Sequence, residues 1–227
     1  MKKFFFLKSL SRSVHDEEDH QQQNETKIAD DGGTCTSLTV WRKSLIINCN
    51  GFTVINSHGD LAYRVDSYMV RPHELILMDG SGKSVLTVHR RKMKFLQKLG
   101  LGDNWEVCAG EVGRYCSTTT ELTKKPIWSV KKHISILRGN DNVLAHVYRG
   151  SCIEKRNNYS YVIEGSYRQR SCKIMDESRN VVAEIKRKEA MVVGVSFGVE
   201  VFLLVVQPGF DPGFAMALVL LLDQMFS

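Results

Sequence analysis

The chain has 227 residues and a mass of 25.8 kDa, enough for one large domain or two small ones with a sizeable core. Hydrophobic residues make up 43% and charged residues 25%, close to the globular average, so composition excludes wholesale disorder and collagen-like structure. The net charge is +6, and none of the six cysteines forms a CxxC pair, so a zinc ribbon or a thioredoxin motif has no support.

The N-terminal segment is predicted to be a tail. Met1–Leu10 begins like a secretory signal, but its apolar run, Phe4–Leu7, is too short and no small-residue cleavage site follows. The polar residues after it lack periodicity, so we predict a mostly disordered tail over 1–34 and a single domain over 35–227. Phe4–Phe6 either packs on that domain or anchors weakly at a membrane interface. Without a signal, the chain is predicted to be intracellular (cytoplasm, periphery of the plasma membrane or nucleus), with reduced cysteines.

From Leu38 onward the dominant pattern is that of β-strands. Leu61, Tyr63 and Val65 alternate with smaller or polar residues, the period of two expected of a strand with one buried face. Short apolar runs separated by Gly, Asn and Asp predict hairpins. The predicted hairpins, written as strand, loop and strand, are 52–55, 56–60 and 61–65; 75–78, 79–83 and 85–88; and 172–175, 176–180 and 181–185.

Two pairs of segments resemble each other. LMDGSGKSVLTVHRRK (77–92) and IMDESRNVVAEIKRK (174–188) share a Met-Asp-x-Ser turn, an apolar strand and a closing basic cluster, and TVWRKSL (39–45) resembles WSVKKHISI (128–136). The similarity indicates two related β halves, with convergence of hairpin sequences as the alternative. Short strands with regular turns favour a closed barrel or a sandwich.

The C-terminus departs from this pattern. The apolar run Met191–Val206 predicts two strands, and Asp211 then suits the N-cap of a helix with Pro212 at its first position. Residues 214–222 include no polar side chain, so the helix is apolar on every face, which requires a membrane or complete burial. Fourteen residues span roughly 21 Å, short of the ~30 Å hydrocarbon core, so we predict burial in protein and no transmembrane span. Asp223 lies in the last turn, where the helix dipole disfavours an anion, so we expect a neighbouring Arg or water at the barrel mouth.

Six runs of the sequence are similar to a known family: LTVWRKSL (38–45), GFTVINSHGDLAYRVDSY (51–68), LMDGSGKSVLTVHRRK (77–92), YVIEGSYRQRSCKIMD (161–176), VVAEIKRK (181–188) and DPGFAMALVLLLDQMF (211–226). In unbroken order over about residues 38–227, the chain resembles the plant LURP-one-related family. The resemblance implies a mainly β fold, a closed twelve-stranded antiparallel barrel enclosing a hydrophobic C-terminal helix, similar to tubby C-terminal domains and phospholipid scramblases. It implies a link to basal plant defence, and related folds bind phosphoinositides and act as membrane-tethered transcription regulators. No tubby lipid-contacting residue is carried over.

Catalytic motifs find no support in the sequence. The histidines form no HExxH pair, no GxSxG surrounds a serine, and Gly82-Lys83-Ser84 lacks the glycine at position 77 that a phosphate-binding loop requires. Asp66 and Glu164 are isolated carboxylates, which we expect to be ion-pair or turn partners. The sequence therefore predicts no enzyme, no metal site and no cofactor.

A basic segment provides the functional hypothesis. Between Asp79 and Asp103 there is no carboxylate, and the candidate anionic-lipid-binding residues there are Lys83, Arg90, Arg91, Lys92, Lys94 and Lys98. Each cation near an anionic leaflet contributes about 1 kcal/mol, and the apolar residues of 93–96 suit a membrane interface. The alternative is a solvated hairpin end that protects the barrel rim from edge pairing.

Two functions remain open from the sequence. One is a non-enzymatic, membrane-tethered regulator in plant defence signalling that binds anionic phospholipids or phosphoinositides. The other is a protein-interaction or transcription-regulating scaffold without a lipid ligand. Sequence-specific nucleic-acid binding is disfavoured because the chain has no helix-turn-helix, zinc finger or RNP-like strand, and scramblase-like transport because no second apolar span exists.

Overall fold

The structure is a computed structural model that describes residues 33–47, 49–67, 74–91, 104–111, 125–134, 142–151, 158–188 and 198–227. All of them belong to the second of two units of the chain, Gly32–Ser227. The elements are β1 (Thr36–Trp41), β2 (Asn50–Ile55), β3 (Leu61–Ser67), β4 (Glu74–Asp79), β5 (Ser84–Arg90), β6 (Asn104–Ala109), β7 (Trp128–Lys132), β8 (Val143–Arg149), β9 (Tyr161–Ser166), β10 (Ser171–Asp176), β11 (Val181–Arg187), β12 (Val201–Val206) and α1 (Pro212–Phe226).

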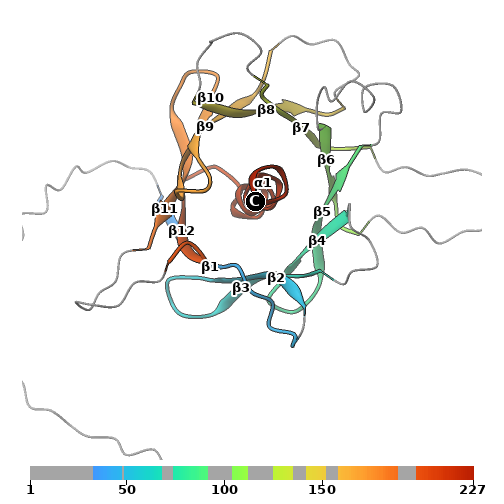
Figure 1. The fold of residues 1–227 in the computed structure, drawn as a ribbon, viewed down its shortest axis with the longest axis vertical. Helices are drawn as coiled ribbons and strands as arrows, with labels where there is room; N and C mark the ends of the chain where they lie inside the picture. The colour runs from blue at the N-terminus through green and yellow to red at the C-terminus, as the bar shows by residue number, and fades with distance from the viewer. Residues whose placement is uncertain are drawn as a thin grey trace, which may run out of the picture. The chain divides into compact units, whose positions relative to one another are not determined.

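The strands form a closed antiparallel barrel with α1 running through its centre (Figure 1). Consecutive strands pair with each other, and β1 closes the ring by pairing with β12 in the register Thr36↔Val206 to Trp41↔Val201. Closure leaves no sheet edge open to pairing with other chains. The twelve-stranded barrel around a C-terminal helix predicted above is therefore confirmed.

The inward side chains of the strands and the helix build one core. Along β1, Leu38 and Val40 are buried while Ser37 and Trp41 are exposed, which is the period of two expected for a strand with one face in the core. The opposing residues Leu204 and Phe202 on β12 are fully buried as well. These residues line the cylinder that α1 fills.

The three predicted hairpins are present, and their turns are fixed by side-chain hydrogen bonds. The Asp79 carboxylate accepts from the amides of Ser81 and Lys83 at 2.9 Å. In the related hairpin, the Asp176 carboxylate accepts from the Asn180 amide at 2.8 Å. Both hairpins also have a register shift just before the turn. Since β4–β5 and β10–β11 are six strands apart in the ring, this agrees with the two related halves suggested by the sequence.

The helix begins and packs as its sequence predicts. The Asp211 side chain accepts from the Phe214 amide at 2.5 Å, and Pro212 occupies the first turn. Every residue from Gly213 to Asp223 is buried, so over this span no face of the helix meets water. Near its start, the Phe214 ring stacks on Trp128 of β7 with the ring centroids 4.7 Å apart. An apolar helix too short for a bilayer is thus buried in protein.

Some predictions concern residues outside the described ranges. The tail is predicted over 1–34, and residues 1–32 of it lie outside the described residues. Two strands are predicted over 191–206, and the structure describes one of them, β12. Cys35, Cys49, Cys108 and Cys172, the cysteines that the described ranges include, are free thiols.

Candidate functional site

The barrel has two chemically different ends. We define the C-terminal rim as the end at which α1 terminates, made of described segments 41–47, 49–50, 90–91, 132–134, 166–171, 187–188 and 198–200 together with Glu74, Asn104 and Val143. The N-terminal rim is the opposite end, made of described segments 55–61, 79–84, 109–111, 125–128, 149–151, 158–161, 176–181 and 206–211.

Charges are unequally divided between these rims. The described basic residues of the C-terminal rim are Arg42, Lys43, Arg90, Arg91, Lys132, Arg168, Arg170, Arg187 and Lys188, and its described acidic residues are Glu74 and Glu200. The described basic residues of the N-terminal rim are Lys83, Lys125, Arg149 and Arg179, and its described acidic residues are Asp60, Asp79, Glu111, Asp176, Glu177 and Asp211. Positive charge therefore gathers where the helix ends.

Part of that charge holds the helix terminus. The Asp223 carboxylate, with its side chain 7% exposed, lies 2.9 Å from Nε of Arg42 and accepts from the hydroxyls of Tyr167 at 3.2 Å and Ser227 at 2.7 Å. Burial opposes the charge on Arg42, but the Asp223 and Glu200 carboxylates outweigh it and raise the pKa of Arg42. The Arg predicted beside Asp223 is thus present.

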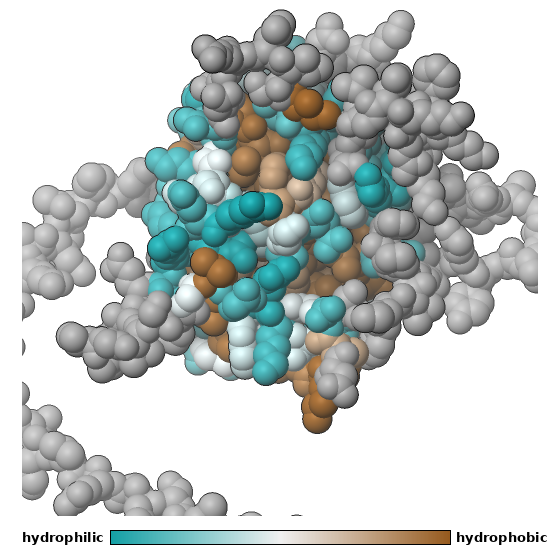
Figure 2. Space-filling model, viewed as in Figure 1, coloured by the Kyte–Doolittle hydropathy of each residue, from teal (hydrophilic) through white to brown (hydrophobic). Residues whose placement is uncertain are grey.

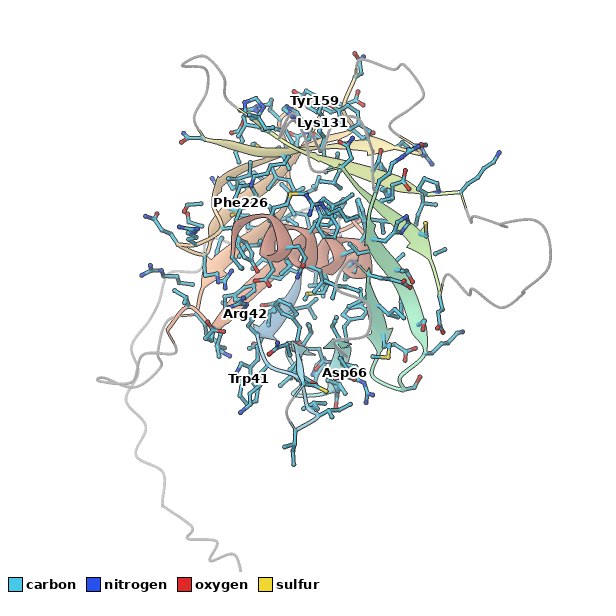
Figure 3. The ribbon with its side chains drawn as sticks, turned by 45° about the vertical axis from the view of Figure 1, so that its right-hand side comes forward. Trp41, Arg42, Asp66, Lys131, Tyr159 and Phe226 are labelled. Carbon is cyan, nitrogen blue, oxygen red and sulfur yellow. The ribbon has the colours of Figure 1, made fainter. Side chains whose placement is uncertain are left out.

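Two further cations reach the last carbonyls of α1. Lys132 donates to the Met225 carbonyl at 2.9 Å and lies over the Phe226 ring, and Arg168 donates to the Phe226 carbonyl at 3.0 Å. Cations at a helix C-terminus complement the dipole. Figure 3 shows Phe226 at one end of the helix, with Arg42 and Trp41 towards the same end.

Three cations of this rim, Arg168 among them, keep their charge available to solvent. Lys43 is exposed and lies over the Trp41 ring, 5.4 Å from its centroid. The exposed Arg168 and Arg187 donate to the carbonyl oxygens of Phe226 and Gln169. Neither an aromatic ring nor a carbonyl cancels a positive charge, so these three side chains make the rim electropositive.

The predicted lipid-binding residues do not form one cluster. Lys83 lies in the β4–β5 turn on the N-terminal rim, while Arg90 and Arg91 follow at the other end of β5. The seven residues of β5 place these ends roughly 23 Å apart. Arg91 bonds to Glu106 at 2.9 Å and to Ser151 at 3.1 Å on the outer wall. Lys92, Lys94 and Lys98 lie outside the described residues.

A second polar cluster lies on the outer wall of β5 and β6. His89 is 3.2 Å from Glu106, which also pairs with Arg91. Hydrogen bonds to Cys108 and Glu106 raise the pKa of His89 to about 9, and the same His89 contact lowers the pKa of Glu106. Because the two side chains hold each other in charged form, the cluster is an ion-pair network joining the two strands.

The isolated carboxylates are ion-paired, as expected from the sequence. Asp66 lies 3.0 Å from Arg64, and Glu164 lies 2.7 Å from Arg179. Within the described ranges, no group of three or more His, Cys, Asp or Glu residues is arranged to hold a metal ion. No helix in this part of the chain is long and apolar enough to cross a membrane.

Sequence reasoning missed three exposed apolar side chains of this rim, which belong to the end of β1 and the segment after it. Trp41 is 39%, Leu45 52% and Ile47 86% exposed. The sequence signal was present, since residues 41–47 combine apolar and basic residues and lack a glycine or proline. Figure 2, a view onto the end at which α1 terminates, shows hydrophobic atoms exposed between hydrophilic ones.

This fold, a barrel filled by its own C-terminal helix, defines a tubby-like protein. The LURP-one-related family model matches residues 36–223, so the chain belongs to the LURP-one-related family. It is 52% identical to Protein LURP-one-related 17 of Arabidopsis thaliana over 99% of this chain and 100% of that one, and 43% identical to Protein LURP-one-related 8 of the same plant over 86% and 90%. An X-ray structure of an Arabidopsis thaliana protein shares the fold at a TM-score of 0.56 and 22% identity, covering 84% of this chain and 90% of that one.

Proposed function

We propose that the protein is a non-enzymatic regulator that docks reversibly on anionic membranes through its C-terminal rim, in the plant defence setting that the family resemblance implies. The observation that carries the proposal is the separation of charge between the two ends of the barrel. A basic surface confined to one end orients the protein on a negative leaflet, and each cation near that surface contributes about 1 kcal/mol.

The charge available for docking comes from Lys43, Arg168 and Arg187. All three are exposed at the same end, and their side-chain contacts with a ring or with carbonyls leave them positive. Arg90 and Arg91, the first residues of the predicted basic segment, lie at this end, whereas Lys92, Lys94 and Lys98 are outside the described residues. Lys83 lies at the other end and has no part in this proposal.

The test is co-sedimentation with vesicles of phosphatidylcholine containing phosphatidylserine or a phosphoinositide, at several salt concentrations. Reversing the charge of Lys43, Arg168 and Arg187 to Glu should weaken binding by on the order of 3 kcal/mol or more. Wild-type binding should fall with rising salt because the screening length shortens to about 8 Å at physiological ionic strength.

The matched control reverses three cations of the N-terminal rim, Lys83, Lys125 and Arg149, and so makes the same change in net charge. It should bind like the wild type. Equal losses in both triple variants would mean that only net charge matters. If the folded C-terminal-rim variant sediments like the wild type, the scaffold function without a lipid ligand is favoured instead.

A further inference from the structure

Residues 41–47, the last residue of β1 and the segment after it, expose apolar side chains in a regular pattern. Trp41, Lys43, Leu45 and Ile47 are exposed, whereas the even-numbered residues between them are buried or half-buried. The inside–outside alternation of β1 thus continues beyond the end of the strand. On its outer side, the segment presents a tryptophan, a lysine, a leucine and an isoleucine to solvent.

The inner side of the segment is fastened by polar contacts. Ser44 is 6% exposed, and its hydroxyl donates to the Asp66 carboxylate at 2.5 Å and accepts from the Ile46 amide at 3.0 Å. The Lys43 carbonyl accepts from the Thr53 hydroxyl at 2.7 Å. A serine faces inward while larger apolar residues face water, the reverse of the usual partition. The hydrogen bonds of the Ser44 hydroxyl and the Lys43 carbonyl fix the backbone of the segment, so its apolar side chains are held facing solvent.

A neighbouring part of the same rim adds to this surface: Val199, before β12, is 42% exposed. Ile134, after β7, is 41% exposed at the same rim but lies six strands away in the ring. The Arg42 amide donates to the Glu200 carbonyl at 2.8 Å, which places the Val199 turn beside the segment. Of the large hydrophobic residues found exposed in the described ranges, only Ile127 belongs to the other rim.

We infer that residues 41–47 insert into the interfacial region of an anionic bilayer. Leu45 and Ile47 enter the acyl boundary, Trp41 lies at the level of the headgroups, where amphipathic rings are favoured, and Lys43 meets lipid phosphate. The complementarity of apolar and positive side chains selects an anionic bilayer as the occupant. This inference rests on the proposed function and names the element by which the rim enters the membrane.

The first test compares the wild type with Leu45→Ser/Ile47→Ser for binding to vesicles of phosphatidylcholine and phosphatidylserine in a 3:1 ratio. The double variant should keep its thermal midpoint, because both side chains are exposed, and lose tenfold or more in binding. The loss should be greatest at high salt, where charge contributes least. Ile127→Ser is the control, an exposed apolar residue on the opposite rim (43%), and should bind like the wild type.

The second test uses Trp41 as a depth probe in vesicles that contain brominated lipid. Wild-type fluorescence should shift to shorter wavelength and be quenched on binding, and Trp41→Phe should remove this response, since Trp105 is buried in the core and Trp128 is half-buried at the opposite rim. Unquenched Trp41 in bound protein overturns the inference. So does a lipid-free wild-type dimer that Leu45→Ser/Ile47→Ser converts to monomer, because the segment is then a protein interface.

The two proposals fail differently. If Leu45→Ser/Ile47→Ser binds vesicles like the wild type while the reversal of Lys43, Arg168 and Arg187 abolishes binding, insertion is refuted and electrostatic docking stands. If neither variant weakens binding, docking by this rim is refuted and insertion is refuted with it.

Discussion

Replacing Arg42 with Ala tests whether the rim cations hold the helix in the barrel. The change removes the guanidinium that lies 2.9 Å from Asp223 and leaves a carboxylate whose side chain is only 7% exposed. Removing one partner of a fully buried ion pair costs about 3–5 kcal/mol, because the remaining charge stays desolvated.

Here the cost should be smaller, for two structural reasons. Arg42 is itself 35% exposed, so water reaches the vacated position, and the hydroxyls of Tyr167 and Ser227 continue to donate to the carboxylate. We therefore expect a loss of about 2 kcal/mol in the free energy of unfolding. In a domain of this size that lowers the thermal midpoint by about 4–8 °C.

The assay is urea and thermal denaturation of the wild type, Arg42→Ala, Asp223→Asn and the double variant. The double variant should be more stable than Arg42→Ala alone, because it has no unpaired buried charge. Glu200→Ala is the control: this carboxylate is 51% exposed and 3.6 Å from Arg42, so its loss should cost less than about 0.5 kcal/mol. An unchanged midpoint in Arg42→Ala, or strict additivity in the double variant, would refute the reasoning.

Three further changes test the core, a turn and a pH dependence. Leu220→Asp buries an unpaired charge in α1 and should abolish cooperative unfolding, as should deletion of 214–227. Gln224→Asp, at an exposed position of the same helix, is the control and should fold. A soluble, cooperatively melting Leu220→Asp would contradict the core assignment. At Gly165 (φ +116°) an added Cβ would lie 2.2 Å from the Ser171 carbonyl oxygen, whereas at Gly59 (φ +90°) nothing lies within 4 Å of it. Gly165→Ala should therefore lower the melting temperature much more than Gly59→Ala does. Equal decreases would refute the steric explanation. The pKa of His89 is about 9 in the folded state and near 6.5 in the unfolded state, so protonated His89 stabilises the fold by at most about 3 kcal/mol. This stabilisation is complete below pH 6.5 and is lost as the pH rises through 9. The stability of His89→Gln should therefore decline less steeply at alkaline pH than that of the wild type, and equal slopes would contradict the assignment.

The sequence predicted those parts of the fold that local chemistry determines. Asp79 and Asp176 each fix a turn through hydrogen bonds within four residues, so their hairpins were visible as short motifs. The helix was visible because its cap, Asp211, and its uninterrupted apolar run are also local. Closure of the barrel depends on the pairing of Thr36 with Val206, which no local pattern reveals, and the family resemblance supplied it.

The candidate site was less accessible to sequence reasoning. The carboxylate-free stretch drew attention to basic residues, but it joined Lys83 to Arg90 although the length of β5 separates them. The exposed segment at 41–47 depends on Ser44 meeting Asp66, a contact between residues 22 positions apart. Its apolar residues would otherwise be assigned to the core. The number and sign of the charges can be read along the chain. Which of the two rims each charge belongs to can be known only from the order and direction of the strands.

The alternation of β1 directs adjacent side chains of one strand end to different surroundings. Val40 and Arg42 share the inward face, so the guanidinium meets Asp223 and the end of the helix. Trp41 and Lys43 share the outward face, where they stack on each other at the surface. The two adjacent cations therefore differ: the charge of Arg42 is neutralised within the protein, and that of Lys43 is exposed and is assigned to an external anion only by the proposed docking. Trp41 pairs with Val201 of β12 and with Thr53 of β2. The backbone that carries the outward side chains is therefore anchored in the barrel wall at Trp41 and does not begin in a loose loop.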